Sequence, residues 1–226
     1  MKQRVQIDVS LAVFAFCLTF LFVRYPHLYF MNQTWDNVLD FIGLFLILEG
    51  TFVRMAARGH KKVFSQRSTQ LVTTGPYSFV RNPMYLGSFL MGLGFVLILW
   101  PWWSVPLFAW IFLSRFNKQM AKEEVYLNKV FGREYETYCR RVPRFFPTFQ
   151  NLEHDPRELM NKEELLSTKE KFGLLAWPIL AVILETLEEV AVFGISDLRQ
   201  TIVIFLSAIL VYALGFIVVY KVLDTE

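Results

Sequence analysis

Long apolar segments separated by shorter polar ones account for most of the chain. A helix needs roughly 20 mostly apolar residues to cross a bilayer, and six segments with their flanks approach that requirement. These segments cover residues 9–23, 38–57, 84–100, 104–116, 172–193 and 201–219. The pattern therefore predicts an all-α, polytopic membrane protein with about six transmembrane helices.

The third and fourth segments are separated only by the turn Pro101-Trp102-Trp103. Because the fourth segment is short, residues 84–116 are expected to form a helical hairpin whose returning helix continues beyond the membrane boundary. Tryptophan rings are favoured at the headgroup level, which fits a turn at the far interface. Helical spacing is present again at residues 120–131, within a polar stretch that Pro143 interrupts.

Lys and Arg residues gather in two loops, one after the second segment and one after the fourth. Cytoplasmic loops carry such an excess, so both loops are predicted to face the cytoplasm, and six crossings return both termini to that side. The chain of 226 residues is 54% hydrophobic and 19% charged, against about 45–50% and about 25% in soluble domains. Composition therefore agrees with an integral, multi-pass membrane location.

Other function classes receive little support from the sequence. A net charge of +3 is too small and too scattered to indicate a nucleic-acid partner. Cys17 and Cys139 offer no disulfide framework, and His27, His60 and His154 are too far apart in sequence to indicate a metal site. No strand is followed by a Gly-rich loop that opens a βαβ unit, which disfavours a soluble methyltransferase architecture. The sequence does not predict an oligomeric state.

A first polar block precedes the hairpin. It reads Thr-Thr-Gly-Pro-Tyr from Thr73 and Arg-Asn-Pro-Met-Tyr from Arg81. The Gly-Pro pair imposes a turn, and Pro83 suits the first turn of a helix, where its missing N–H is not needed. Taken alone, this block is also typical of a helix start with a positive charge on the cytoplasmic side.

Two further polar blocks follow the hairpin. Arg115, Gln119 and Glu123 have i, i+4, i+8 spacing, which places them on one helix face, and Glu124 follows directly. Phe131-Gly132 then leads through two tyrosines to Val142-Pro143-Arg144. Taken singly, these blocks are also compatible with a solvated helix and with a basic amphipathic surface on lipid headgroups.

The order and spacing of the three blocks resemble the isoprenylcysteine carboxyl methyltransferase and phospholipid methyltransferase superfamily. The shared pattern is Gly-Pro-Tyr, Arg-x-Pro-x-Tyr, an apolar hairpin, Glu-Glu, Phe-Gly-x-x-Tyr-x-x-Tyr and Val-Pro-Arg, over about residues 60–148. The resemblance implies an integral membrane enzyme that uses S-adenosyl-L-methionine and methylates a lipid-borne or lipophilic acceptor at the cytoplasmic membrane face. A prenylcysteine-like carboxylate and a phospholipid amine are both compatible acceptors.

The same resemblance implies the site residues, position by position. The residues that match the family's cofactor cradle are Thr69, Gln70, Leu71, Val72, Tyr77, Asn82, Pro83, Tyr85 and Glu123. Arg81 and Arg141 match family arginines near the reacting groups. Glu124 or water would have to serve as a base for an amine acceptor, whereas a carboxylate needs orientation more than acid–base chemistry. The chain departs from the family at Asn82, where histidine is usual, and at Gln119, where a basic residue is common.

Two alternatives stay open on the sequence alone. Membrane sterol reductases that use NADPH have a similar closing segment, but their intervening element typically reads Arg-Asp followed by cysteine, where this chain has Glu123-Glu124. A non-catalytic membrane scaffold with a decayed cofactor pocket is the other alternative, and the departures at Asn82 and Gln119 are the features that favour it.

These inferences divide the chain into four parts. Residues 1–58 hold the first transmembrane helices, and residues 59–150 form the methyltransferase-like core. Residues 151–170 are a polar linker, and residues 171–226 add two further transmembrane helices outside the resemblance.

Three glutamates, Glu185, Glu188 and Glu189, interrupt the fifth apolar segment. Ionisable groups at membrane depth are costly and indicate function by default. The simpler interpretation is that the helix ends near Leu184 and the glutamates lie at the far interface, and this is the expectation we adopt.

Overall fold

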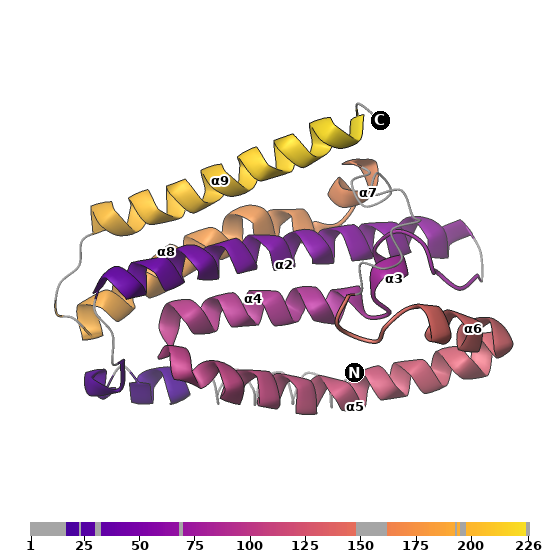
Figure 1. Ribbon diagram of the computed structural model, residues 1–226, viewed down its shortest axis with the longest axis horizontal. Helices are drawn as coiled ribbons and strands as arrows, with labels where there is room; N and C mark the ends of the chain where they lie inside the picture. Colours follow the sequence, from indigo (N-terminus) through magenta and orange to yellow (C-terminus); the bar gives the residue numbers. More distant parts are fainter. Residues whose placement is uncertain are drawn as a thin grey trace.

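The computed structural model describes residues 17–22, 24–29, 33–67, 70–147, 162–192, 194 and 198–224. Over these residues the chain is helical and contains no strand, so the predicted all-α class is confirmed. The long helices lie side by side in a bundle (Figure 1). They are α2 (Gln33–Arg67), α4 (Pro83–Leu99), α5 (Val105–Phe131), α8 (Gly173–Val192) and α9 (Leu198–Asp224).

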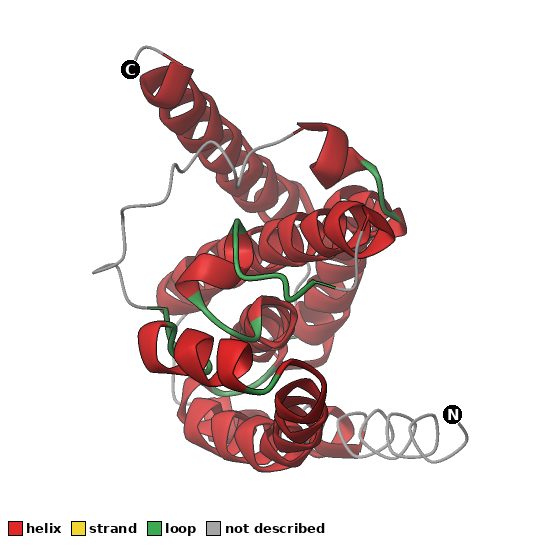
Figure 2. Cartoon of the chain, turned by 90° about the vertical axis from the view of Figure 1, so that its right-hand side faces the viewer, coloured by secondary structure: helices red, strands yellow, loops and turns green. Residues whose placement is uncertain are grey.

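Short elements join the long helices. They are the α-helices α3 (Pro76–Phe79), α6 (Arg133–Arg141) and α7 (Lys162–Leu166), and the 3-10 turns η1 (Pro26–Tyr29), η2 (Trp102–Ser104) and η5 (Lys169–Phe172). Figure 2 views the bundle from the end that carries α6, where several connecting loops meet.

Helices α2 and α4 approach so closely that only glycine fits between them. A Cβ atom on Gly50 would lie 2.5 Å from the backbone oxygen of Gly87, and one on Gly94 would lie 2.4 Å from that of Gly43. Small residues allow membrane helices to pack backbone to backbone in this way. The contact fixes α4, and the polar motif at its start, against the middle of α2.

Helices α4 and α5 form the predicted hairpin through η2, and α5 continues as one helix of 27 residues. The apolar first half of α5 packs on α4: the ring of Phe89 lies 5.6 Å from that of Phe108 and 5.2 Å from that of Phe112. The polar second half extends past the end of α4 (Figure 1). The prediction that the returning helix continues beyond the apolar stretch is therefore confirmed.

The chain reverses after α5 at Gly132, whose φ of 52° lies in the left-handed region that glycine adopts readily. Helix α6 then packs Tyr135 and Tyr138 into an apolar cluster with the end of α5. The backbone N–H of Arg81 donates to the carbonyl oxygen of Pro143 at 2.9 Å. The Val-Pro-Arg segment thereby lies against the start of α4, although the two are far apart in sequence.

The C-terminal helices pack against α2. Leu44 and Ile47 of α2, Ala181 of α8 and Phe205 of α9 are almost fully buried in one apolar cluster. At the other end of α2, the side chain of Lys62 donates to the carbonyl oxygen of Ser167, in the segment between α7 and η5. The part of the chain outside the family resemblance therefore contacts α2 along much of its length.

The prediction that the fifth apolar helix ends near Leu184 is wrong, because α8 extends to Val192. Glu185, Glu188 and Glu189 are only 1%, 2% and 4% exposed. Glu185 faces carboxylates of α2 inside the bundle. The glutamates interrupt the apolar pattern because they face this buried partner, and not because the helix has ended.

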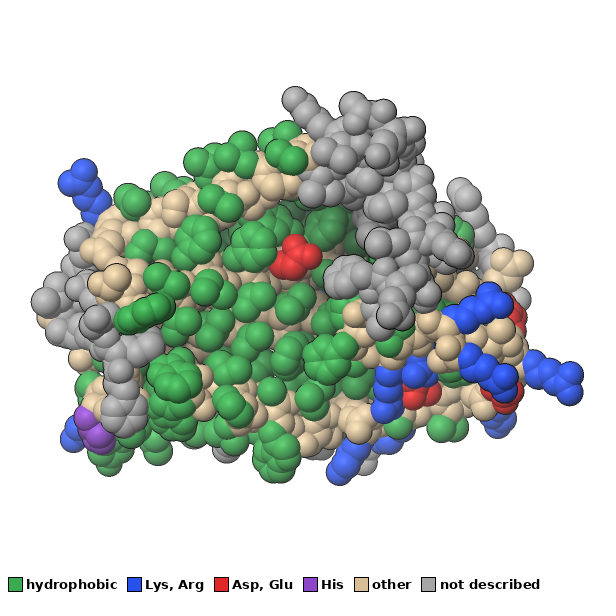
Figure 3. Space-filling model, in the orientation of Figure 1, with side chains coloured by type: hydrophobic (Ala, Val, Ile, Leu, Met, Phe, Trp, Pro, Cys, Tyr) green, Lys and Arg blue, Asp and Glu red, His purple; other side chains and the backbone are tan. Residues whose placement is uncertain are grey.

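One helical segment among the described residues, Leu198–Val218, is long and apolar enough to cross a membrane, and Pro83–Leu99 is a shorter apolar helix. Exposed apolar side chains are frequent on α8 and α9; Leu175, Leu206 and Leu210 are each more than half exposed. Figure 3 shows apolar side chains over the middle of the bundle and Lys and Arg gathered at the α6 end. Most of segment 9–23 lies outside the described residues.

Candidate functional site

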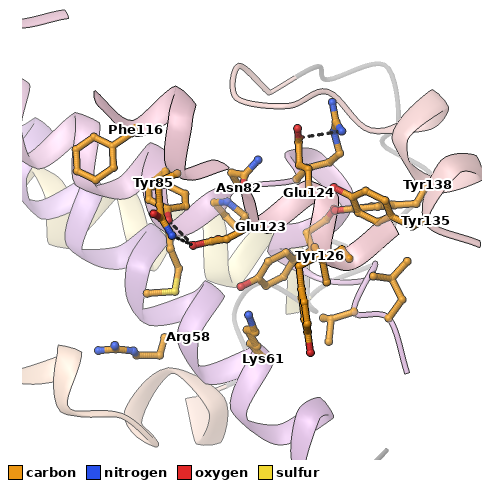
Figure 4. Close-up of a pocket in the computed structure, with 18 of the residues that line it drawn as sticks. Arg58, Lys61, Asn82, Tyr85, Phe116, Glu123, Glu124, Tyr126, Tyr135 and Tyr138 are labelled. Atoms are coloured by element: carbon orange, nitrogen blue, oxygen red, sulfur yellow. Dashed lines mark hydrogen bonds and ion pairs between the residues drawn. The ribbon is translucent and has the colours of Figure 1, made fainter. Parts of the chain in front are cut away.

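A cavity of about 700 Å³ lies at the α6 end of the bundle, between α2, the start of α4, the polar half of α5 and α6 (Figure 4). Its size is within the range of about 300–1,000 Å³ that is usual for small-molecule sites. Most of the residues implied by the sequence motifs line it. They are Gln70, Leu71, Val72, Tyr77, Arg81, Asn82, Pro83, Tyr85, Glu123 and Glu124.

Two residues of the predicted set are not among the lining residues. Thr69 lies outside the described residues. Arg141 is exposed at the last position of α6 and does not line the cavity. The chain turns immediately afterwards, and Nη2 of Arg144 lies 3.1 Å from Oε2 of Glu124. Arg144 therefore reaches Glu124 beside the cavity, although it is not itself a lining residue.

Glu123 lies on the α5 wall, where two neighbours orient its carboxylate (Figure 4). The hydroxyl of Tyr85 donates to Oε1 at 2.6 Å, and the amide nitrogen of Gln119, one turn earlier on α5, donates to the same oxygen at 3.0 Å. A carboxylate held in this way is prepared to bind an ammonium group or hydroxyl groups.

Tyr77 completes the same wall. Burial, and then the negative charge of Glu123, raises the pKa of its phenol above the usual value near 10. The hydroxyl of Tyr138 donates to the carbonyl oxygen of Tyr77 at 2.7 Å, and burial is also the main cause of the raised pKa of Tyr138. Both phenols therefore remain neutral hydrogen-bond donors at physiological pH.

Glu124, next to Glu123 on α5, forms ion pairs with two arginines. Its Oε1 lies 3.0 Å from Nη1 of Arg81, and its Oε2 contacts Arg144. Burial alone would lower the pKa of the Arg81 guanidinium, but the charge of Glu124, with smaller contributions from Cys139 and Tyr135, raises it overall. Arg81 is therefore a fixed cation at the edge of the cavity.

Asn82 stands at the start of α4, where the family resemblance has histidine. Its side-chain amide donates to the backbone oxygen of Arg144 at 3.0 Å. Pro83 follows as the first residue of α4. Asn82 therefore holds the segment after α6 against α4, a role that an amide fills without any titrating group.

Positive charge lines the wall that faces Glu123. Arg54, Arg58 and Lys61 lie on α2 with i, i+4, i+7 spacing, which puts them on one helix face, and Arg115 adds a cation from α5. Figure 4 shows Arg58 and Lys61 across the cavity from Glu123. From the sequence, these α2 cations indicated only the orientation in the membrane, although their spacing was a signal for a shared helix face.

Glu170 of η5 pairs with this basic wall. Its Oε1 lies 3.0 Å from Nη2 of Arg54, its Oε2 lies 3.2 Å from Nε of the same arginine, and it also forms an ion pair with Arg58. Arg54 donates in addition to the hydroxyl of Ser88 on α4. Because Glu170 lies outside the resemblance, no motif could have identified this contact.

The loop that carries Gln70 to Val72 is held in place by His60 of α2. The Nδ1 atom of His60 lies 2.9 Å from Oε2 of Glu164 on α7, and Nε2 lies 2.9 Å from the hydroxyl of Thr74. Gly75 has a φ of 58°, and a Cβ atom there would lie 2.8–3.0 Å from three atoms of the His60 ring. Only glycine therefore allows the turn that presents Tyr77 to the cavity.

Comparison with known proteins agrees with the motifs. Residues 38–134 match the model of the phospholipid methyltransferase family. The chain is 30% identical over 134 residues to the protein-S-isoprenylcysteine O-methyltransferase of Schizosaccharomyces pombe, covering 58% of this chain and 56% of that protein. It is 33% identical over 104 residues to the protein-S-isoprenylcysteine O-methyltransferase B of Arabidopsis thaliana, covering 45% and 53% of the two chains.

A third relative is the protein-S-isoprenylcysteine O-methyltransferase of Saccharomyces cerevisiae, which is 32% identical over 109 residues, covering 45% of this chain and 46% of that protein. The chain spans about half the length of these curated relatives. No solved structure matches. The resemblance found in the motifs is confirmed, and the named relatives are methyltransferases.

Proposed function

With residues 38–134 matching the phospholipid methyltransferase family, we propose that this chain transfers a methyl group from S-adenosyl-L-methionine to the carboxylate of a lipophilic acceptor. The observation that carries this proposal is the convergence of Tyr77, Tyr85 and Glu123 on one cavity whose facing wall is cationic. The acidic wall suits the ammonium and hydroxyl groups of the donor, and the basic wall suits an anionic acceptor.

The residues present fit S-adenosyl-L-methionine. Glu123, oriented by Tyr85 and Gln119, would bind the ammonium group or the ribose hydroxyls. Leu127 and Phe131 add apolar lining that suits the adenine base. When bound, the sulfonium group supplies an electrophilic methyl group. About 700 Å³ leaves space for the reacting end of an acceptor beside it.

Arg81 is the residue we assign to the acceptor's carboxylate. A guanidinium group binds a carboxylate through two parallel hydrogen bonds, and this one is fixed by Glu124 at 3.0 Å. Glu124 holds both Arg81 and Arg144, so we assign it the orientation of these cations and not the removal of a proton. An amine acceptor would need a base to deprotonate it, whereas a carboxylate is already nucleophilic.

The names of the relatives support the same acceptor class, since each is called an isoprenylcysteine O-methyltransferase. We propose a prenylcysteine-like carboxylate or another lipid acid as the acceptor. Arg54 and Arg58, on the basic wall formed by α2, would then attract the anionic group of the acceptor electrostatically before it reaches Arg81.

We further propose that the apolar segments cross the membrane six times, with both termini and the cavity on the cytoplasmic side. The exposed apolar side chains of α8 and α9 support burial in lipid, and the concentration of Lys and Arg at the α6 end supports the orientation. Residues 59–150 then form the catalytic core, and residues 171–226 form an accessory helix pair behind α2.

The test uses the purified full chain in detergent or nanodiscs. Calorimetry should detect binding of S-adenosyl-L-methionine, with NADPH as the comparison cofactor for a reductase. Transfer of a labelled methyl group should then occur to N-acetyl-S-farnesylcysteine and not to its methyl ester, whose carboxylate is blocked. Binding of NADPH alone, or methylation of phosphatidylethanolamine vesicles in place of the farnesylcysteine, would contradict the proposal.

A further inference from the structure

At the end of the bundle opposite the cavity, five carboxylates from two helices are buried together. They are Asp36 and Asp40, in the first turns of α2, and Glu185, Glu188 and Glu189, in the last turns of α8. Their side chains are between 1% and 7% exposed. Arg58 of the cavity wall follows Asp40 by about five turns of α2, or roughly 27 Å, so the cluster is separate from the proposed methyl-transfer site.

Three of these carboxylates already have the arrangement of a ligand set. One oxygen each from Asp36, Asp40 and Glu185 lies within 4.8 Å of the other two. Oxygens that bind Ca²⁺ lie at 2.3–2.6 Å from the ion, so ligands on opposite sides of it are separated by about 4.6–5.2 Å. A single cation between the three oxygens could therefore contact all of them after at most a small adjustment of the side chains.

Glu188 gives an observation independent of that trio. It is 2% exposed, and neither of its carboxylate oxygens has a hydrogen-bond partner at normal distance; the nearby hydroxyl of Tyr29 donates to the carbonyl oxygen of Leu99 at 2.8 Å. It interacts electrostatically with Glu185 and Asp36, so it lies beside the trio. Oδ1 of Asp40 and Oε2 of Glu185 also lack partners.

No Lys or Arg within the described residues forms an ion pair with Asp40, Glu185 or Glu188. Buried charges normally have such a partner, because an unpaired carboxylate is costly to bury. The negative charge of the cluster must therefore be neutralised by protons on the carboxyl groups or by a bound cation, because no neighbouring Lys or Arg does so.

We propose that this cluster binds one divalent cation of the hard, oxygen-preferring class, with Ca²⁺ as the best fit. Asp36, Asp40 and Glu185 are the direct ligands, and Glu188 completes the coordination. Carboxylates suit Ca²⁺, Mg²⁺ and Mn²⁺, whereas zinc and copper sites in proteins usually include histidine or cysteine. The hydroxyl of Thr201 on α9 donates to Glu189 at 3.1 Å, so the cation links α2 to α8 and indirectly to α9.

The experiment is calorimetric titration of the metal-free full chain with calcium chloride at neutral pH, followed by magnesium and manganese chloride. We expect one saturable Ca²⁺ site per chain. Asp40→Asn and Glu185→Gln, which keep the side-chain volumes, should each weaken binding at least tenfold. Glu49→Gln is the matched control: Glu49 is a largely buried acid on α2 that accepts a hydrogen bond from Tyr212 and lies outside the cluster.

Thermal unfolding provides a second measurement that does not depend on methyl transfer. Calcium should raise the melting temperature of the wild type and of Glu49→Gln over their values in EDTA, and should leave that of Asp40→Asn unchanged. Folded wild type that binds none of the three cations saturably overturns the proposal. Equal Ca²⁺ affinity in the wild type, Asp40→Asn and Glu185→Gln also overturns it, because the binding site would then lie elsewhere.

Discussion

Replacement of Glu123 by glutamine tests the acidic wall of the cavity most directly. The amide has the shape of the carboxylate, and its oxygen can still accept the hydrogen bond from Tyr85, now 2.6 Å long, so the fold should be preserved. The negative charge is lost. A hydrogen bond to a charged group contributes about 1.5–3 kcal/mol, and each 1.4 kcal/mol is tenfold in affinity. We therefore expect Glu123→Gln to bind S-adenosyl-L-methionine about 10–100-fold more weakly.

Two further variants make the result interpretable. Tyr85→Phe removes a hydrogen bond that orients Glu123 but leaves the charge that contacts the donor, so the loss of affinity should be smaller than in Glu123→Gln. Glu136→Gln changes an exposed acid on α6 and should bind like the wild type. In calorimetry, Glu136→Gln should bind S-adenosyl-L-methionine most tightly, Tyr85→Phe more weakly and Glu123→Gln most weakly. A Glu123→Gln affinity within twofold of the wild type, or a larger loss in Tyr85→Phe, would refute the assigned role.

Two more predictions concern the basic wall and the helix packing. Glu170→Gln releases Arg54 and Arg58 from their ion pairs, so the KM for a farnesylcysteine acceptor should fall about fivefold, corresponding to about 1 kcal/mol. The affinity for the methyl donor should not change. A rise in KM would contradict this prediction and would mean that Glu170 positions the two arginines. Gly50→Ala places a Cβ atom 2.5 Å from a backbone oxygen of α4. Overpacking of this kind should lower the free energy of unfolding by about 1–3 kcal/mol, as measured by thermal or denaturant unfolding. An unchanged melting temperature would contradict the close packing of α2 and α4.

The convergence of the methyltransferase motifs could be predicted from the sequence because each motif marks a helix end. Pro83 starts α4, and the polar continuation of α5 carries Glu123 back toward that start. A hairpin brings such segments together whatever the details of packing. The motif order therefore identified both sides of the cavity formed by α4 and α5.

Contacts between segments that no motif connects could not be predicted in this way. The cations Arg54 and Arg58 were assigned to membrane orientation because their partner, Glu170, is more than a hundred residues later in the chain. Arg144 was given no site role, because its contact with Glu124 depends on where α6 ends and the chain turns. These positions depend on tertiary packing, which local patterns do not report.

The prediction that the helix ends before the three glutamates of α8 was wrong for a related physical reason. A charged residue in an apolar helix has the same appearance in sequence whether it marks the helix end or faces a polar partner. Only the position of Asp40 on α2, opposite Glu185 on α8, separates the two cases. The pairing joins residues about 145 positions apart, so it follows from the fold and not from the period of the helix.

The glycine contact between α2 and α4 limits how a bulky tail can reach the reacting end. Gly50 and Gly94 bring the two backbones so close that an acyl or prenyl chain has no space to pass between the helices at these positions. If the proposed acceptor enters from the bilayer, its tail must therefore pass beside this helix pair and not between α2 and α4.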